Sequence, residues 1–190
     1  MMMNRDRKNV VAAARSMFSE GFQERTDLEQ YFWTAATVQR LVQSLMYIRD
    51  CCCLTTPSLG VGFHEAGREE TVLDIDRRFE YLPKFRYFDI LYPVGVQEEE
   101  FKILVIDPPF FYIPMETLFE AVMVVTKGST TTKLMIGFLK REEETLLRAF
   151  KPFQLRRTDF PLEYATVKPN KWQNYVLYSN VDLPGIRRHK

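Results

Sequence analysis

The sequence contains few cysteines and histidines and no long apolar run. Its three cysteines are adjacent, at Cys51, Cys52 and Cys53, and only two histidines occur among 190 residues. Adjacent side chains on a strand point to opposite faces, and no C-x-x-C spacing is present. We therefore expect reduced, structural thiols, and neither a metal site nor a redox pair. No apolar run approaches the roughly 18 residues that a membrane-spanning helix requires, so we expect no membrane contact.

Internal repeats, low-complexity tracts and the apolar h-region of a secretory signal are also missing from this sequence. Hydrophobic residues make up 46% of the chain and charged residues 27%, as in ordinary globular domains. A chain of 190 residues suits one domain, because a single core usually holds roughly 100 to 200 residues. We therefore expect a soluble protein with one main core.

Both ends of the sequence are basic, while the part between them is mildly acidic. Residues 1–18 carry a net charge of +3 and residues 185–190 another +3, which leaves −5 for the remainder of a chain whose total is +1. We divide the chain into a basic extension (1–25), a domain (26–184) and a basic tail (185–190). Basic ends are typical of arms that bind phosphate groups, and equally of solvated chain ends. We expect a cytoplasmic protein. A mitochondrial one is the alternative, because the first 18 residues are poor in acid and rich in Arg, Ala and Met, as in organellar transit sequences.

Short apolar segments alternate with segments of helical periodicity. The apolar segments have the length of strands, and several are too apolar to keep one face in water, which is typical of a parallel sheet covered on both faces. We expect strands at 51–56, 71–76, 87–92, 101–107, 133–139, 153–157 and 175–180.

Helical patterns fill several of the gaps between these strands. Apolar positions 38, 41, 42 and 45 form one face of a helix over 34–46, a second helix runs from Pro114 to Lys127-Gly128, and a third covers 141–150. Capping-box spacing from Thr26 to Glu29 marks a further turn or helix start. The alternation predicts a doubly wound, Rossmann-like α/β fold, with a central, mostly parallel sheet of about seven strands flanked by helices.

Three loops follow predicted strand ends, where such sheets bind their ligands. The first, Leu54–Gly62, contains a G-x-G, a weak sign of a nucleotide-binding turn, since Thr, Pro and Ser occupy the turn itself. The second contains Asp74 and Asp76; an acid there accepts hydrogen bonds from ribose hydroxyls in nucleotide-binding folds, and an N-cap or ion pair is the alternative. The third loop is Asp107-Pro108-Pro109-Phe110.

The third loop carries the most specific signal. Both prolines lack an N–H and hold φ near −65°, which frees the carbonyls of Asp107 and Pro108 from strand pairing. A carboxylate beside such a carbonyl suits an amino group, whose two N–H donors it can hold and orient. The ring of Phe110 offers a surface for a flat or aliphatic amine-bearing group. The turn therefore predicts a site that binds and orients an amine.

At these residues the sequence resembles a known family. A [DNS]-P-P-[YFW] turn after the fourth strand is the signature of amino-methyltransferases that depend on S-adenosylmethionine. The closer similarity is to the N6-adenine methyltransferase-like family, which includes the elongation factor 1A lysine methyltransferase, the nearest match, and the methyltransferase domain of a zinc-finger ribosomal RNA adenine methylase. The resemblance covers about Gln30 to Ile186 and is carried by residues 31–34, 54–59, 73–79, 88–89, 107–110 and 175–180.

The resemblance implies a class I methyltransferase fold, with S-adenosylmethionine as the cofactor and no metal. In this family a T-P-S turn replaces the usual glycine-rich loop. Thr55, Pro57 and Ser58 would line the methionine part of the methyl donor. Asp76, with Asp74 as the alternate, would hold the ribose.

The resemblance also implies an acceptor site. The residues that would form it are Asp107, Pro108, Pro109 and Phe110, with Phe32 and Trp33 helping to close it around the substrate.

The class of acceptor is left open by these residues. The negative charge of the domain suits a cationic protein segment better than a phosphate backbone, so our first expectation is a protein lysine, in a substrate of the translation elongation factor type. N6 of adenine in ribosomal RNA, other RNA or DNA is the alternative, with the basic ends as anchors. A third alternative is a catalytically inactive scaffold within a ribosomal or other large ribonucleoprotein assembly.

Overall fold

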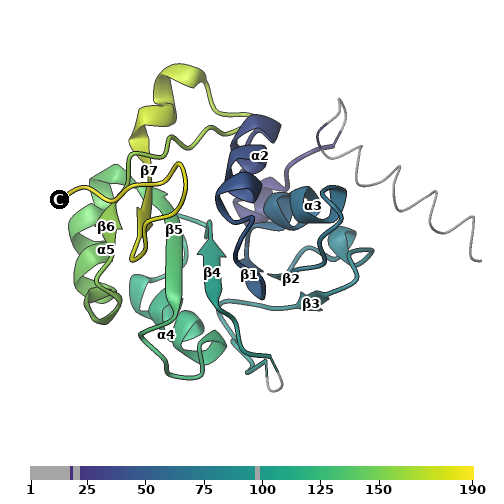
Figure 1. Cartoon of the computed structure of the whole chain (residues 1–190), viewed down its shortest axis with the longest axis horizontal. Coiled ribbons are helices and arrows are strands. Elements are labelled where there is room, and N and C mark those ends of the chain that lie inside the picture. The colour runs from purple at the N-terminus through teal and green to yellow at the C-terminus, as the bar shows by residue number, and fades with distance from the viewer. Residues whose placement is uncertain (1–17, 19–21, 97–98) are drawn as a thin grey trace, which may run out of the picture.

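The structure, a computed structural model, describes residues 18, 22–96 and 99–190. It contains a seven-stranded sheet flanked by helices (Figure 1). The strands are β1 (Cys51–Leu54), β2 (Thr71–Asp74), β3 (Phe85–Tyr87), β4 (Ile103–Ile106), β5 (Lys133–Leu139), β6 (Arg156–Arg157) and β7 (Tyr175–Ser179). The α-helices are α2 (Ala35–Ser44), α3 (Pro57–Glu65), α4 (Met115–Val125) and α5 (Glu143–Ala149). Short 3-10 helices are η1 (Thr26–Leu28), η2 (Arg77–Phe79), η3 (Lys140–Glu142), η4 (Lys151–Phe153) and η5 (Pro169–Asn174).

The strand order is β3-β2-β1-β4-β5-β7-β6. The first five strands pair in parallel, and β7 is antiparallel to both of its neighbours, β5 and β6. The prediction of an α/β fold with a mostly parallel sheet of about seven strands flanked by helices is confirmed. The strand order reverses between β1 and β4. Because open α/β sheets bind ligands beyond the carboxyl ends of the strands at such a reversal, we expect a ligand site at the carboxyl ends of β1 and β4.

The central strands are buried because the chain covers both of their faces. All residues of β1, β2 and β4 are buried, as their uninterrupted apolar runs predict. Helices α2 and α3 lie on the β1–β2 side of the molecule in Figure 1, and α4 and α5 lie toward β5 and β6. The three cysteines are buried in β1, where burial raises the pKa of Cys51 to about 12 and keeps the thiol protonated.

Two of the predicted strands need correction. The strand expected at 87–92 is instead Phe85–Tyr87, because Asp89 forms a turn in which its carboxylate accepts the Leu91 N–H at 2.9 Å. The strand expected at 153–157 shortens to Arg156–Arg157, because Lys151–Phe153 forms a 3-10 turn. The turn expected from the capping-box spacing at Thr26 is confirmed as the 3-10 helix η1, although no side chain caps its N-terminus.

The glycines of the predicted first loop lie in a helix. Helix α3 begins at Pro57, in its favoured first-turn position, and includes Gly60 and Gly62. A Cβ atom on Gly60 would lie 2.3 Å from Val72 of β2, and one on Gly62 would lie 2.3 Å from Val38 of α2. These glycines allow α3 to approach the sheet and α2 closely, so they serve packing and do not form a ligand-binding turn.

The basic tail at 185–190 folds back on the sheet edge. The Arg187 N–H donates to Asp159 Oδ1 at 2.8 Å, and the Arg188 guanidinium pairs with Asp182 at 3.1 Å. Most of the predicted basic extension lies outside the described residues, although Phe22 and Glu24 contact the domain. Within the described ranges no helix has the length and apolar character needed to cross a bilayer.

Candidate active site

A pocket lies at the carboxyl ends of β1, β2 and β4, beside the point where the strand order reverses. Its walls come from the loops that follow these three strands and from one segment near the N-terminus. The lining residues are Leu28 to Phe32, Thr55 to Ser58, Asp74, Ile75 and Asp107 to Phe110. All three loops singled out in the sequence therefore meet at one site.

The turn after β1 forms the floor of this pocket. Thr55 has a left-handed backbone, with φ of 56°, which is unusual for a β-branched residue, and its N–H donates to the Leu73 carbonyl at 2.9 Å. Thr56 is buried and its hydroxyl donates to the Val105 carbonyl of β4 at 3.1 Å. Pro57 and Ser58 then begin α3. The structure thus places Thr55, Pro57 and Ser58 at the pocket, where the sequence predicted them.

The two predicted ribose-binding acids occupy different positions. Asp74 ends β2 and lines the pocket; its Oδ1 accepts the N–H of Asp76 at 2.7 Å. Burial raises the pKa of the Asp74 carboxyl to about 7, and the backbone hydrogen bond from Asp76 opposes that rise. Asp76 is fully buried and does not line the pocket. Of the two, Asp74 is therefore the residue that a ligand can reach.

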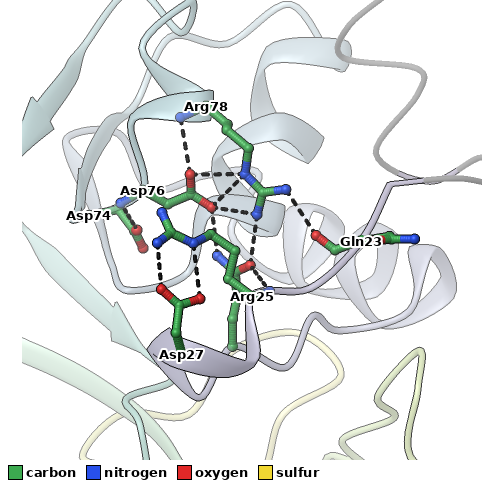
Figure 2. A network of polar contacts seen from close by, with 7 residues as sticks. Gln23, Arg25, Asp27, Asp74, Asp76 and Arg78 are labelled. Carbon is green, nitrogen blue, oxygen red and sulfur yellow. Dashed lines mark hydrogen bonds and ion pairs between the residues drawn. The ribbon is translucent and has the colours of Figure 1, made fainter.

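The carboxylate of Asp76 is engaged within the protein (Figure 2). The Arg78 guanidinium donates to both of its oxygens, at distances of 2.7 to 3.1 Å, and Gln30 Nε2 donates to Oδ2 at 2.9 Å. Burial alone would raise the pKa of Asp76, but the hydrogen bonds from Arg78 and Gln30 lower it below its usual value. The signal for this pair was present in the sequence as Asp76-Arg77-Arg78.

The same arginine fastens the N-terminal segment above the pocket. Arg78 also donates to Gln23 O and to Gln30 Oε1, both at 2.9 Å, and its guanidinium lies 4.6 Å from the ring centre of Phe22. Next to the Asp107 turn, Glu29 Oε2 accepts the N–H of Phe111 at 3.0 Å. We call residues 22–32 the roof segment, because Leu28 to Phe32 close one side of the pocket.

Asp107 and the two prolines form the wall opposite the roof segment. The β4 ladder ends at Ile106, and Asp107 to Phe110 all line the pocket. Burial raises the pKa of Asp107 well above its usual value, and a hydrogen bond from the Tyr164 hydroxyl to Asp107 Oδ1, at 2.7 Å, acts in the opposite direction. Tyr164 was missed by the sequence reasoning, because it lies in a loop with no motif around it.

Aromatic rings surround the Asp107 turn. The ring centre of Phe110 lies 5.5 Å from that of Tyr175 and 6.4 Å from that of Tyr164. Phe32 lines the pocket as predicted, whereas Trp33 does not line it and is buried behind Asp107, near Gly137. Trp33 is therefore placed to support the site and not to contact a ligand in the pocket.

A second groove begins beside this wall. It is lined by Phe111, Leu139, Lys140, Arg141, Asn174 and Tyr175. The Arg141 guanidinium lies 5.6 Å from the ring centre of Phe111, and both side chains are exposed. The groove is basic and aromatic, while the pocket itself contains carboxylates. In the part of the chain that the structure describes, no three His, Cys, Asp or Glu side chains gather in a way that could hold a metal ion.

Comparison with known proteins gives a family and a fold. A family described as "Probable N6-adenine methyltransferase" matches residues 24–183. No curated protein sequence matches the chain.

Three solved structures are similar at low sequence identity. A branched-chain polyamine synthase variant from Thermus thermophilus, in complex with N4-aminopropylspermidine and 5′-methylthioadenosine, has a TM-score of 0.58 at 16% identity. The chain aligns over 92% of its own length and spans 62% of that synthase. A candidate RNA methyltransferase from Pyrococcus horikoshii scores 0.52 at 15% identity, covering 93% of this chain and 96% of that one. A Thermoplasma acidophilum protein scores 0.51 at 16% identity, covering 89% and 99%.

Proposed function

The chain belongs to the family described as probable N6-adenine methyltransferases, a family of S-adenosylmethionine-dependent enzymes, and we propose on that premise that it methylates the ε-amine of a protein lysine. The observation that carries the proposal is the acidic lining of the pocket. Its lining contains the carboxyl groups of Glu29, Asp74 and Asp107, and no Lys, Arg or His. Such a lining favours cationic ligands, and both the sulfonium of the donor and the ammonium of a lysine are cations.

The residues of the floor fit the donor. Thr55, Pro57 and Ser58 would hold its methionine part, and the N-terminus of α3, which begins at Pro57, would face the carboxylate of that part. Asp74 would accept the ribose hydroxyls in place of Asp76, whose oxygens are taken by Arg78 and Gln30. The similar fold of the polyamine synthase, which binds an amine and a methylthioadenosine, supports this assignment.

The turn at Asp107 would hold the acceptor. When bound, the donor supplies an electrophilic methyl group on a sulfonium. The carboxylate of Asp107 and the Pro108 carbonyl would accept N–H groups of the amine and aim its lone pair, so that alignment and desolvation provide the catalysis. A lysine must first lose a proton, which costs roughly 4 to 5 kcal/mol at neutral pH from a pKa of about 10.4. The apolar ring of Phe110 would reduce that cost by disfavouring the charged form.

The mouth of the pocket favours a cationic substrate. Tyr112, two residues after Phe110 of the pocket lining, is exposed, and after burial the main causes of its raised pKa are the charges of Glu29, Asp89 and Asp27. Over residues 22–132, which supply all of the pocket lining, seventeen Asp and Glu stand against ten Lys and Arg. A lysine-containing segment with basic neighbours would be attracted to this side. A substrate of the translation elongation factor type would present such a segment.

N6 of adenine in RNA or DNA is the second candidate, and a specific feature favours it. The groove at Lys140 and Arg141 joins cations to the exposed ring of Phe111 and the half-buried ring of Tyr175, a combination typical of surfaces that bind single-stranded nucleic acids. The family description and the fold shared with a candidate RNA methyltransferase support this reading as well. A flipped adenine would meet the same Asp107 turn with an amine that is already neutral.

The test is transfer of labelled methyl from S-adenosylmethionine into cell extract, followed by separate protease and nuclease digestion. Label lost on protease digestion supports lysine, and label released by nuclease supports adenine. Asp107→Ala should abolish transfer and leave donor binding intact, while Asp182→Ala, a matched aspartate on the far surface, should leave both unchanged. Donor binding by the wild type without any transfer would contradict the proposal and favour the inactive scaffold.

A further inference from the structure

We propose that Tyr164 is a positioning residue for the acceptor amine: its hydroxyl fixes Oδ1 of Asp107, so that Oδ2 is presented to the pocket as the hydrogen-bond acceptor for the amine. The inference rests on the proposed transfer of a methyl group to an amine at Asp107. It assigns a role to a residue that no motif marks and that lies 57 positions from Asp107 in the sequence.

The hydrogen-bond pattern of Asp107 is asymmetric. The Tyr164 hydroxyl donates to Oδ1 at 2.7 Å, and among the described residues no other group donates to this carboxylate. Asp107 lines the pocket, and Oδ2 has no partner within the described part of the protein. Because an ionised carboxylate is an acceptor only, the free oxygen is complementary to an N–H group.

A second wall limits the movement of the held oxygen. Gly137, in β5 beside β4, lies so close that a Cβ atom there would be 2.6 Å from Asp107 Oδ1. The same position would be 3.4 Å from Cζ2 of Trp33. Oδ1 is therefore confined between the Gly137 backbone and the Tyr164 hydroxyl, which fixes the rotation of the carboxylate and the direction of Oδ2.

Tyr164 is itself held on three sides, as a positioning residue must be. Its backbone pairs with Trp33, through hydrogen bonds from Thr34 N to Glu163 O at 2.8 Å and from Ala165 N to Phe32 O at 2.9 Å. Its carbonyl accepts the Trp172 indole N–H at 3.1 Å. Its ring centre lies 4.5 Å from that of Tyr175, and its side chain is fully buried. The hydroxyl therefore has little freedom to turn away from Asp107.

The pair also determines the charge of the carboxyl group. Burial raises the pKa of Asp107, and the Tyr164 hydrogen bond, which stabilises the ionised form, lowers it. Tyr175 of β7 also interacts electrostatically with this carboxyl, and Glu29 and Asp74 line the same pocket. Without the hydroxyl, Asp107 would stay protonated to higher pH, and its neutral form is a poorer acceptor for the amine.

The experiment compares Tyr164→Phe with Tyr178→Phe. Tyr178 also donates from a buried hydroxyl to a carboxylate, Glu143, at 2.8 Å, but it lies outside the pocket, so it is a matched control. Tyr164→Phe should lower kcat by about 10- to 100-fold, the range for loss of one hydrogen bond to a charged group, with the donor Kd unchanged. The acidic limb of the pH–rate profile should move to higher pH. Tyr178→Phe should change neither kcat nor the acidic limb of the pH–rate profile.

A second readout does not depend on activity. Carbon-13 NMR of labelled aspartate, with Asp107→Asn to assign the signal, should show a higher titration midpoint for Asp107 in Tyr164→Phe than in the wild type. An active wild type whose Tyr164→Phe variant keeps both its pH profile and its Asp107 midpoint would overturn the positioning role alone. A wild type that transfers no methyl group to any amine would overturn the proposed function, and the positioning role with it.

Discussion

Gly137 and Asp107 face each other across the paired strands β5 and β4 so closely that one added methyl group would lie 2.6 Å from the carboxylate oxygen. In a strand interior a glycine usually weakens the sheet, so its presence here is explained by the close approach of another group. The relationship makes the middle of β5, far from any motif, part of the site that we propose for the acceptor.

Gly137→Ala should impair methyl transfer more than it impairs folding. The new methyl group would force the Asp107 carboxylate to rotate, since Gly137 itself lies in a strand that cannot move without disturbing β4 and β7. We expect kcat to fall about 10-fold or more and donor affinity to change little. Gly95→Ala is the control, because a Cβ atom there would meet nothing within 4 Å. Equal activities of the two variants would show that the contact can relax.

Donor affinity should increase between pH 6 and pH 8. The Asp74 carboxyl, with its pKa near 7, is protonated at the lower pH and ionised at the higher, and the ionised form attracts a cationic donor more strongly. Calorimetric titration across this range should therefore show tighter binding as pH rises. The dependence should disappear in Asp74→Asn. A wild-type Kd that stays constant over the range would contradict the assignment of Asp74 to the donor.

Arg78→Ala should loosen the roof segment. It removes the hydrogen bonds to Gln23, Gln30 and Asp76 and leaves the Asp76 carboxylate buried without its cation, at a cost of about 2 to 3 kcal/mol in the free energy of unfolding. The pKa of Asp76 is lower in the folded protein than in the unfolded chain, where an aspartate has a pKa of about 3.9. The stabilisation is therefore complete at pH values above the pKa of the unfolded chain, and it is lost as the pH falls through the pKa that Asp76 has in the folded protein.

Urea unfolding at pH 7 and hydrogen exchange over residues 22–31 measure this effect. Arg77→Ala is the matched control, since Arg77 pairs with Glu80 on the exposed side of the same turn. We expect faster exchange and weaker donor binding in Arg78→Ala only. Similar exchange in both variants would show that the roof segment is held by Glu24 and Glu29 and does not need the arginine.

Thr55→Gly should stabilise the fold while weakening donor binding. The left-handed φ of 56° is strained for a β-branched residue and unstrained for glycine, so we expect the free energy of unfolding to rise by about 1 kcal/mol or less. The lost side chain lines the pocket, so the donor Kd should increase. A destabilised variant in thermal unfolding would mean that the hydroxyl, which donates to Leu54 O at 2.6 Å, outweighs the strain.

The sequence predicted best what depends on local patterns. The apolar run at 133–139 is a strand with those bounds, and the turn Asp107 to Phe110 lies at the carboxyl edge of β4 as expected. The strand at 87–92 was placed wrongly, because the turn at Asp89 outweighs the aromatic residues around it. Local patterns also could not decide between Asp74 and Asp76, since that depends on which acid Arg78 engages.

Tyr164 and Gly137 could not have been found from local patterns at all. Each acts on Asp107 through tertiary packing, and neither lies in a motif or at a predicted strand end. In the sequence, Gly137 is only a glycine inside an apolar strand. Such a glycine indicates that another group approaches the backbone closely, but the sequence does not identify that group. Tyr164 reaches the site because its loop pairs with Trp33, more than a hundred residues earlier in the chain.

That pairing has a consequence for synthesis on the ribosome. The turn at Asp107 emerges 57 residues before Tyr164, an interval of roughly 3 to 11 s at about 5 to 20 residues per second. During this time the strands of the donor side, β1, β2 and β4, are already available, while the strand-like partner of Trp33 does not yet exist. A chain that ends before Tyr164 would thus have the residues proposed for the donor without the hydroxyl proposed to position the acceptor, so the proposed transfer requires synthesis to have passed Tyr164.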